Sequence, residues 1–419
     1  MNSLFGSGKT VWRAGFQVSY EGFQTQMLSL GPAVSSPNAF NFDYRTPAGT
    51  PGRGIANWSK QLPSAPPVAP SIGDAQDGMI EKDYRSPYTE RWSLSVQREL
   101  PGRTVIEGAY VGTGSHKLAT RADLNPVIGP GQRRLFPEFG QRWIRTSEGN
   151  SSYHAMQWRV DRRFAEGFQA GVSNTWSKNM DSTSEGVGNV NNQNTNMTFT
   201  SVPVRDGGMR LDRGLSDFHR SHRLTISYLW EMPGPARGIW KQAFGGWTIA
   251  GIATFQSGAP FTLLNNSDRN GDQTMADRPD IGNPNAPLNS RAIIVATTVC
   301  NTGYRNPDTA SCVSPSEVRW VQGNGPPNAS TVGRNTLFTG GVNNLDISLF
   351  KSFTIGERRR LEFRWEAFNA LNHQQFTQVP NRNVRDAQAP ANGFASQFLN
   401  QDFTNSGIRS MWAQVKLLF

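Results

Sequence analysis

The chain has 419 residues and a net charge of +10, and 36% of its residues are hydrophobic while 11% are aromatic. Disordered chains are poor in aromatic residues, so we expect this one to fold. It has no run of 18 apolar residues, which excludes a membrane-spanning helix but not a β-barrel. The basic residues are interleaved with acidic ones instead of forming a block, so no nucleic acid is expected as a partner.

Alternation of apolar and polar residues is the main structural signal along the chain. Ten segments place apolar or aromatic residues at every second position, with polar or small residues between them. A period of two predicts strands with two different faces. In chain order, the strands are expected around residues 12–20, 92–97, 106–110, 156–161, 168–176, 224–231, 247–255, 345–349, 361–367 and 410–419.

A soluble β-sandwich would show the same alternation, but two features favour a membrane barrel. The strands are about ten residues long, which suits a tilted strand that crosses a bilayer. The connections alternate between short turns and long loops, as in outer-membrane barrels. We therefore predict an all-β fold, an antiparallel transmembrane β-barrel of about ten strands. The long loops are expected at about 21–89, 113–151, 179–221, 259–342 and 370–406.

The polar side of the predicted strands carries charge. Arg159 and Asp161 share one face of a strand, and Glu362, Arg364 and Glu366 share one face of another. Such charges would be costly in a dry core, whereas a hydrated lumen removes most of that cost. The opposite face is expected to contact the lipid bilayer, with aromatic side chains near the strand ends. Its tryptophans are Trp12, Trp92, Trp158, Trp176, Trp230, Trp247 and Trp365.

The last strand ends on an aromatic residue. Met411, Ala413, Val415, Leu417 and Phe419 alternate with polar residues up to the final position. Bacterial outer-membrane proteins commonly finish in this way, and the barrel-assembly machinery reads that strand. The pattern predicts a C-terminal assembly signal and, by strand parity, a C-terminus on the short-turn, periplasmic side.

The two cysteines, Cys300 and Cys312, lie close together in a polar stretch. They indicate a disulfide formed in an oxidising compartment, and two unrelated free thiols are the alternative. The first residues show no secretory signal peptide, which conflicts with export.

Metal and catalytic motifs are sparse. Asp268, Asn270 and Asp272 match the first part of a calcium-binding loop, although no glutamate follows at the twelfth position. An Asx-rich turn is the alternative. His219 and His222 could pair on a metal or could simply mark the entry to a strand. No catalytic constellation is present, so the protein is not expected to be an enzyme, and no cofactor is expected other than this possible Ca²⁺.

Motif-like stretches occur along the whole chain: Pro87-Tyr-x-x-x-Trp92 leading into Ser93–Val111, Tyr110-Val-Gly112-x-x-Gly114-Ser115-His116-Lys117, Ser151-Ser-Tyr153-His-Ala155-Met156-Gln157, Asp217-Phe-His219-Arg220-Ser-His222-Arg223, Gly246-Trp247 through Gln256-Ser257-Gly258-x-Pro260-Phe261, Asp346-x-Ser348-Leu349-Phe350-Lys351 and Phe363–Asn369 with Asn372-His373-x-x-Phe376. Together these stretches resemble the C-terminal half of the barrel in TonB-dependent transporters of the Oar-like branch.

The resemblance implies a barrel of 22 strands, of which this chain supplies less than half. Residues 1–419 are then expected to be the C-terminal portion of that barrel, with no plug domain and no signal peptide. An open half-barrel would expose two unpaired edges, so a gene fragment or a split partner is expected.

The resemblance also implies a place and a role. The place is the outer membrane of a Gram-negative cell. The role is ligand binding and uptake, with TonB acting through a plug that this chain lacks and with a ligand that is not readable. A structural or adhesive surface barrel without transport is the alternative, and a soluble carbohydrate-binding module is a weaker one.

Overall fold

The computed structural model describes residues 8–22, 77–125, 127–128, 133–137, 143–184, 208–235, 240, 244–269, 277–355, 359–378, 381–385, 398–399, 402–403 and 408–419. The elements described there are β-strands and one short 3-10 helix, η4 (Gly208–Arg210). In these ranges no helix combines the length and the apolar character that a membrane span requires.

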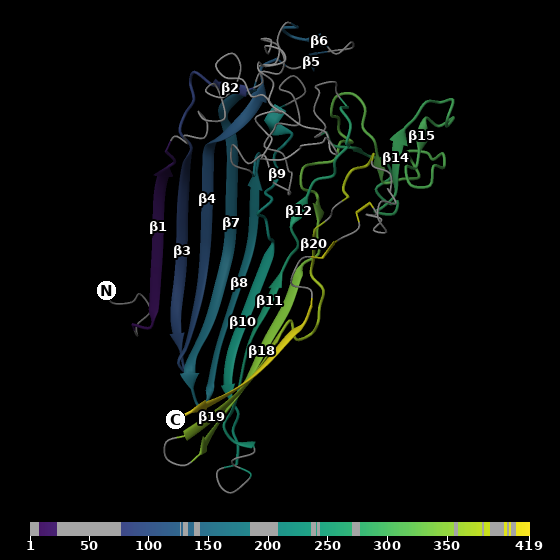
Figure 1. Ribbon diagram of the computed structural model, residues 1–419. Helices are drawn as coiled ribbons and strands as arrows, with labels where there is room; N and C mark the ends of the chain where they lie inside the picture. The colour runs from purple at the N-terminus through teal and green to yellow at the C-terminus, as the bar shows by residue number, and fades with distance from the viewer. Residues whose placement is uncertain are drawn as a thin grey trace, which may run out of the picture.

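One large sheet dominates the fold (Figure 1). Its main path has ten strands, and each pairs antiparallel with the next strand of the path along the chain. This up-and-down sheet confirms the all-β class and the predicted strand count. The ten strands are β1 (Thr10–Tyr20), β3 (Tyr88–Leu100), β4 (Thr104–Asp123), β7 (Trp143–Ala165), β8 (Phe168–Asp181), β10 (His222–Glu231), β11 (Trp247–Gln256), β18 (Val342–Ile355), β19 (Arg359–Phe368) and β22 (Ser410–Leu418).

The register keeps the two predicted faces separate from strand to strand. Tyr228 pairs with Gly251, Gly251 with Ile347, Ile347 with Ala367, and Ala367 with Met411. Because side chains at paired positions point to the same side of a sheet, these five residues form one row on the apolar face. A slip of one residue would turn a whole strand over, so the alternation fixes the register.

The turns at one end of the sheet are tight. Glu166 and Gly167 connect β7 to β8, and both have positive φ angles, 53° and 77°. Two successive positive φ angles are typical of the primed turns that match strand twist, and glycine adopts them without a steric cost. Gly102 and Arg103 repeat the pattern between β3 and β4. The predicted short turns therefore lie together at the end that also holds the C-terminus (Figure 1).

Strands β4 and β7 are longer than the alternation predicted, at 20 and 23 residues. Their distal halves lack large apolar residues at every second position, and the register shifts around Leu118. At Gly112 of β4, the lack of a side chain is explained by packing. A Cβ on Gly112 would overlap the indole ring of its cross-strand partner Trp92, so this glycine leaves room for the ring.

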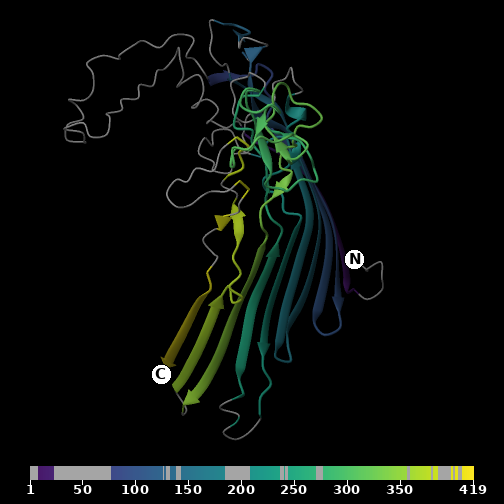
Figure 2. The ribbon, with the colours of Figure 1, turned by 90° about the vertical axis from the view of Figure 1, so that its right-hand side faces the viewer.

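The long connections gather at the opposite end of the sheet (Figure 2). Residues 257–269 and 277–341, which we call the loop assembly, form several short strands around a small core. The core residues are Phe261, Leu263, Trp320 and Val332, joined by Val384 and Phe398 from the later segment between β20 and β21. The short strands are β12 (Pro260–Phe261), β13 (Asp280–Ile281), β14 (Arg291–Ile294), β15 (Tyr304–Arg305), β16 (Trp320–Val321) and β17 (Leu337–Phe338).

Six further short strands complete the described part. Two of them attach to the main sheet: β2 pairs in parallel with β7, and β9 pairs antiparallel with β8. The other four form two separate pairs, β5 with β6 and β20 with β21. Their bounds are β2 (Asp77–Ile80), β5 (Val127–Ile128), β6 (Arg133–Arg134), β9 (Gly214–Leu215), β20 (Phe376–Gln378) and β21 (Asp402–Phe403).

The main sheet is curved and open. Strands β1 and β22 stand at the two ends of its path, and among the described residues neither pairs with a strand on its other side. Figure 2 shows these first and last strands at opposite margins of the sheet. Each edge presents backbone donors and acceptors that a membrane cannot satisfy.

Candidate functional site

The polar face of the sheet forms a charged wall. Arg13 lies 2.8 Å from Gln97 and 3.9 Å from Glu107, so the first, second and third strands of the path are linked. Arg159 pairs with Asp161 at 2.5 Å within β7. These side chains are about a third to two thirds exposed, and each such pair contributes only about 0–1 kcal/mol. The pairs therefore make the wall hydrophilic more than they stabilise it.

The same wall continues on the far side of the sheet. Arg364 contacts Glu366, and Arg360 lies 3.3 Å from Glu362. The structure thus brings the predicted charges of both strands onto one face. Near the short turns, this face is hollowed by a cavity of about 1090 Å³. Its charged lining includes Glu231, Arg360, Glu362, Arg364 and Lys416.

The opposite face carries an apolar belt, with exposed large side chains on eight of the ten strands and half-buried or buried ones on β18 and β19. Phe16 is 69% exposed, Trp176 61% and Val415 65%. A contiguous apolar surface of this extent is unfavourable in water and is what a lipid-facing surface requires. Exposed belt residues include Trp12, Leu94, Tyr110, Met156, Trp158, Trp230, Phe255, Met411 and Leu417.

Lys351 is a cation on the belt side of β18. It pairs with Trp247 and Phe363 in the ladder and is only 3% exposed. Its ammonium lies 5.0 Å from the ring centroid of Trp247 and 4.7 Å from that of Phe353. Aromatic faces attract a cation and shield it from the acyl chains.

Buried arginines attach the loop assembly to the rim of the sheet. Arg334 donates to Asp181 at 2.7 Å and to the backbone oxygen of Asp212 at 3.2 Å. Its neighbour Asn335 donates to the backbone oxygen of Leu215 and to Asp217. The side chains of Arg334 and Asp181 are only 7% and 5% exposed. These contacts hold the loop assembly against the ends of β8 and β9.

Other buried arginines connect the loop assembly to further segments of the chain. Arg291 lies 2.5 Å from Asp308, donates to the backbone oxygen of Asn383, and stacks 4.2 Å from the ring centroid of Phe398. Arg278 binds Asp212 at 2.9 Å. No sequence motif marked these arginines, because their partners are far away along the chain.

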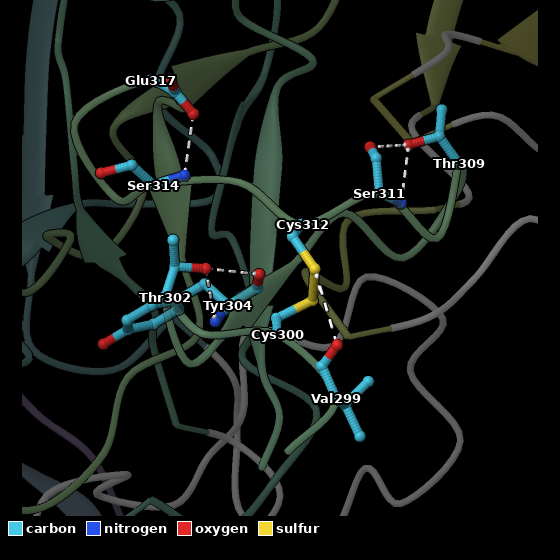
Figure 3. Close-up of a disulfide and its surroundings, with 9 residues drawn as sticks. All are labelled: Val299, Cys300, Thr302, Tyr304, Thr309, Ser311, Cys312, Ser314 and Glu317. Carbon is cyan, nitrogen blue, oxygen red and sulfur yellow. Dashed lines mark hydrogen bonds between the residues drawn. A yellow bond between two sulfur atoms is a disulfide. The ribbon is translucent and has the colours of Figure 1, made fainter. Parts of the chain in front are cut away.

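The two cysteines lie in the loop assembly: Cys300 stands between β14 and β15, and Cys312 follows β15 (Figure 3). Cys300 and Cys312 are joined by a disulfide. Cys300 is buried and Cys312 is exposed. Local hydrogen bonds flank the disulfide, between Thr309 and Ser311 and from the Ser314 amide to Glu317.

The predicted calcium loop is described only in part. Asn270 and Asp272 lie outside the described residues, while Asp268 lies within them. The nearby carboxylates Asp277 and Asp280 are both engaged by Arg269. Within the described residues, no group of three or more His, Cys, Asp or Glu side chains could hold a metal ion. The Ca²⁺ site at Asp268, Asn270 and Asp272 stays a prediction.

The two histidines of the His219-x-x-His222 motif have separate surroundings. His222 stacks on Trp176, with ring centroids 6.3 Å apart, on the belt side. His219 is buried, and its Nδ1 accepts a hydrogen bond from the backbone amide of Asn179 at 3.2 Å. His219 thereby satisfies a backbone amide of β8 from the segment between β9 and β10. The motif thus marks the entry to strand β10, which is the second of the two predicted alternatives.

Burial lowers the pKa of His219 below 6.5, and the charges of Arg220 and Lys178 lower it further. The folded state therefore favours the neutral ring, while the unfolded chain takes up a proton below about pH 6.5. We expect stability to fall as the pH drops from 6.5 toward the lower folded pKa. Thermal unfolding between pH 8 and pH 5 should show a steeper loss for the wild type than for His219→Gln. Equal slopes would contradict the prediction.

The C-terminal residues lie on β22 and just beyond it. Met411, Ala413, Val415 and Leu417 pair with apolar positions of β19 and belong to the belt side. Phe419 follows the strand and is 87% exposed. Their role as an assembly signal stays a prediction.

A curved antiparallel sheet with one apolar face, one charged face, short turns at one end and long loops at the other defines a wall of an outer-membrane β-barrel. The chain belongs to the outer membrane beta barrel domain family, whose model matches residues 3–402. The protein is therefore an outer-membrane protein of the Gram-negative type, from a family of membrane barrels that are not enzymes.

Solved structures with a similar arrangement include the outer membrane transporter YddB from Escherichia coli, at 9% identity and a TM-score of 0.49. The siderophore receptor PiuA from Acinetobacter baumannii has 7% identity and a TM-score of 0.41, and the ferric-catecholate import receptor Fiu from E. coli has 9% and 0.40. The matches cover 99%, 98% and 98% of this chain but only 39%, 34% and 33% of those chains. No curated protein sequence matches the chain.

Proposed function

We propose that this chain forms the C-terminal part of the barrel of a TonB-dependent outer-membrane transporter and takes part in ligand binding and uptake. The charged wall is the observation that carries the proposal. A wall of ion pairs facing inward suits a hydrated lumen or a polar plug, and it would be costly in a dry interior. The cavity of about 1090 Å³ near the short turns adds room on that wall at its periplasmic end.

The open edges support the second part of the proposal, that the barrel is larger than this sheet. Strands β1 and β22 both need partners in a bilayer, and further strands between them would supply the missing hydrogen bonds. The sequence resemblance to TonB-dependent transporters suggests a total of 22 strands. The plug that would bind TonB then comes from sequence other than these residues.

The loop assembly would contribute to the ligand-binding surface. Its position over one end of the sheet and its buried ionic contacts make it a fixed structure rather than a loose loop. Binding surfaces are often built from loops that a rigid scaffold positions. The ligand itself is not assigned.

A TonB-binding measurement tests the proposal. The full-length protein that carries this chain would be purified from outer membranes in detergent and titrated with the periplasmic domain of TonB. We expect the full-length protein to bind, and we expect residues 1–419 alone not to bind. Absence of binding by the full-length protein, together with normal outer-membrane location, would favour the structural or adhesive barrel instead.

A further inference from the structure

The ladder between β8 and the next strand is interrupted near the outer end of the sheet. Strand β9 pairs with β8 at Met180, and β10 resumes the pairing at Trp176. Between these points, residues 216–221 lie opposite only residues 177–179. Single backbone hydrogen bonds close the two ends of this irregular segment, from Ser216 to Asn179 and from Ser177 to Ser221.

A pocket of about 500 Å³ opens beside this interruption. The ladder pairs Tyr110 with Met156 and Met156 with Trp176, which places all three in one row of the belt. The pocket therefore opens toward the lipid and not toward the charged wall. We call it the lipid-face pocket, and its main lining residues are Tyr110, His154, Met156, Trp176, Lys178 and Leu215.

Among the described residues, Lys178 is the one lysine or arginine in the lining of this largely apolar pocket, which also includes His219, Ser177 and Ser221. Lys178 is exposed and pairs across the ladder with His154. The structure shows no ion pair between Lys178 and any described residue. The His154 ring lies beside it, with Nδ1 2.7 Å from the hydroxyl of Tyr110. A lysine on a lipid-facing surface is favourable when its ammonium reaches an anionic group at the membrane interface.

The position of the pocket along the strands shows which leaflet of the outer membrane it faces. Lys178 lies close to Asp181, the last residue of β8, at the end of the sheet where the long loops gather. The short turns occupy the other, periplasmic end. The pocket therefore meets the outer leaflet, whose main lipid in Gram-negative cells is lipopolysaccharide. Its lipid A portion combines acyl chains with phosphate groups.

We propose that the lipid-face pocket binds lipid A, with one acyl chain in the apolar cavity and a phosphate on the ammonium of Lys178. The apolar lining suits the chain, and the cation suits the phosphate. The two features occur together at the interface depth where such a lipid presents both. This site does not depend on transport, because it needs only an outer-membrane barrel.

Native mass spectrometry of the full-length protein tests the site. The protein would be purified from outer membranes, stripped of lipid by detergent exchange, and titrated with bisphosphorylated lipid A. We expect Lys178→Gln to weaken lipid A binding roughly fivefold, as loss of one interfacial lysine does. Met156→Trp should weaken it as well, by filling the pocket. The matched controls are Lys416→Gln on the polar wall and Met411→Trp on the belt away from the pocket, and both should bind as the wild type does.

The choice of occupant is tested by competition. Phosphatidylethanolamine, added in equal amount, should not displace lipid A from the wild type. Displacement would overturn the assignment to lipid A in favour of an ordinary phospholipid. Wild-type affinity in Lys178→Gln would overturn the phosphate contact, and wild-type affinity in Met156→Trp would overturn the acyl-chain site. The folded state of each variant is checked by its heat-modifiable migration in gels.

Discussion

Replacing Arg334 with methionine is expected to release the loop assembly from the rim of the sheet. The arginine is 7% exposed, and it binds the 5%-exposed Asp181 and lies 3.7 Å from Asp217. Removal of one partner of a buried ion pair leaves an uncompensated charge and costs about 3–5 kcal/mol. Limited proteolysis of the folded protein should show faster cleavage within residues 277–341. Thermal unfolding should show an earlier transition.

The matched control is Arg159→Gln, because Arg159 is also paired but its side chain is 64% exposed. Exposed pairs contribute about 0–1 kcal/mol, so this variant should be cleaved at the wild-type rate. A second variant, Arg334→Met with Asp181→Leu, removes both charges and should recover part of the loss. If Arg334→Met were as resistant to protease as Arg159→Gln, the buried pair would not be what holds the loop assembly.

The ten strands could be predicted because each one is amphipathic over its own length. In β19, the alternation of Leu361, Phe363 and Trp365 with Glu362 and Arg364 appears in any short window of the sequence. Successive side chains of a strand face the bilayer and the hydrated interior in turn, so apolar and polar residues alternate with a period of two. The two faces followed from the same signal, and the pairing of apolar with apolar positions in the ladder confirms them.

The loop assembly could not be predicted in the same way. Arg334 and Asp181 are 153 residues apart, and Arg291 bonds to Asn383 across 92 residues. Neither partner stands in a local pattern, so nothing in a short window distinguishes a buried arginine from a solvated one. Long-range ionic contacts depend on how two loops meet, and only the folded chain shows that.

Lys351 shows where alternation misleads. The strand pattern places this lysine in line with Leu345, Ile347 and Leu349, on the face expected to be apolar. In the sequence, Lys351 therefore interrupts the row of apolar residues that is expected to face the lipid. The rings of Trp247 and Phe353 cover its ammonium, and the whole side chain is buried, so almost none of the lysine reaches the lipid-facing surface. The face is thus continuous in space although the sequence pattern is broken.

Introducing a charged residue on the apolar belt tests whether this face contacts lipid, as in a membrane barrel, or water, as in a soluble sheet. We choose Ile226 for this substitution. It lies in the middle of β10, paired with Val172 on one side and Ala253 on the other. Arginine at the midplane of the lipid face costs about 2–4 kcal/mol in transmembrane barrels. Ile226→Arg should therefore lower the amount of folded, heat-modifiable protein in outer membranes several-fold.

The neighbouring residue Ser227 provides the control on the opposite face. It pairs with Gly171 and Ile252 on the side of the charged wall. Ser227→Arg adds the same charge at the same depth but into a hydrated space, so it should fold and reach the outer membrane at nearly the wild-type level. Equal levels for the two variants would contradict the assignment of the faces. A larger loss for Ser227→Arg would mean that the charged wall, and not the belt, contacts the lipid.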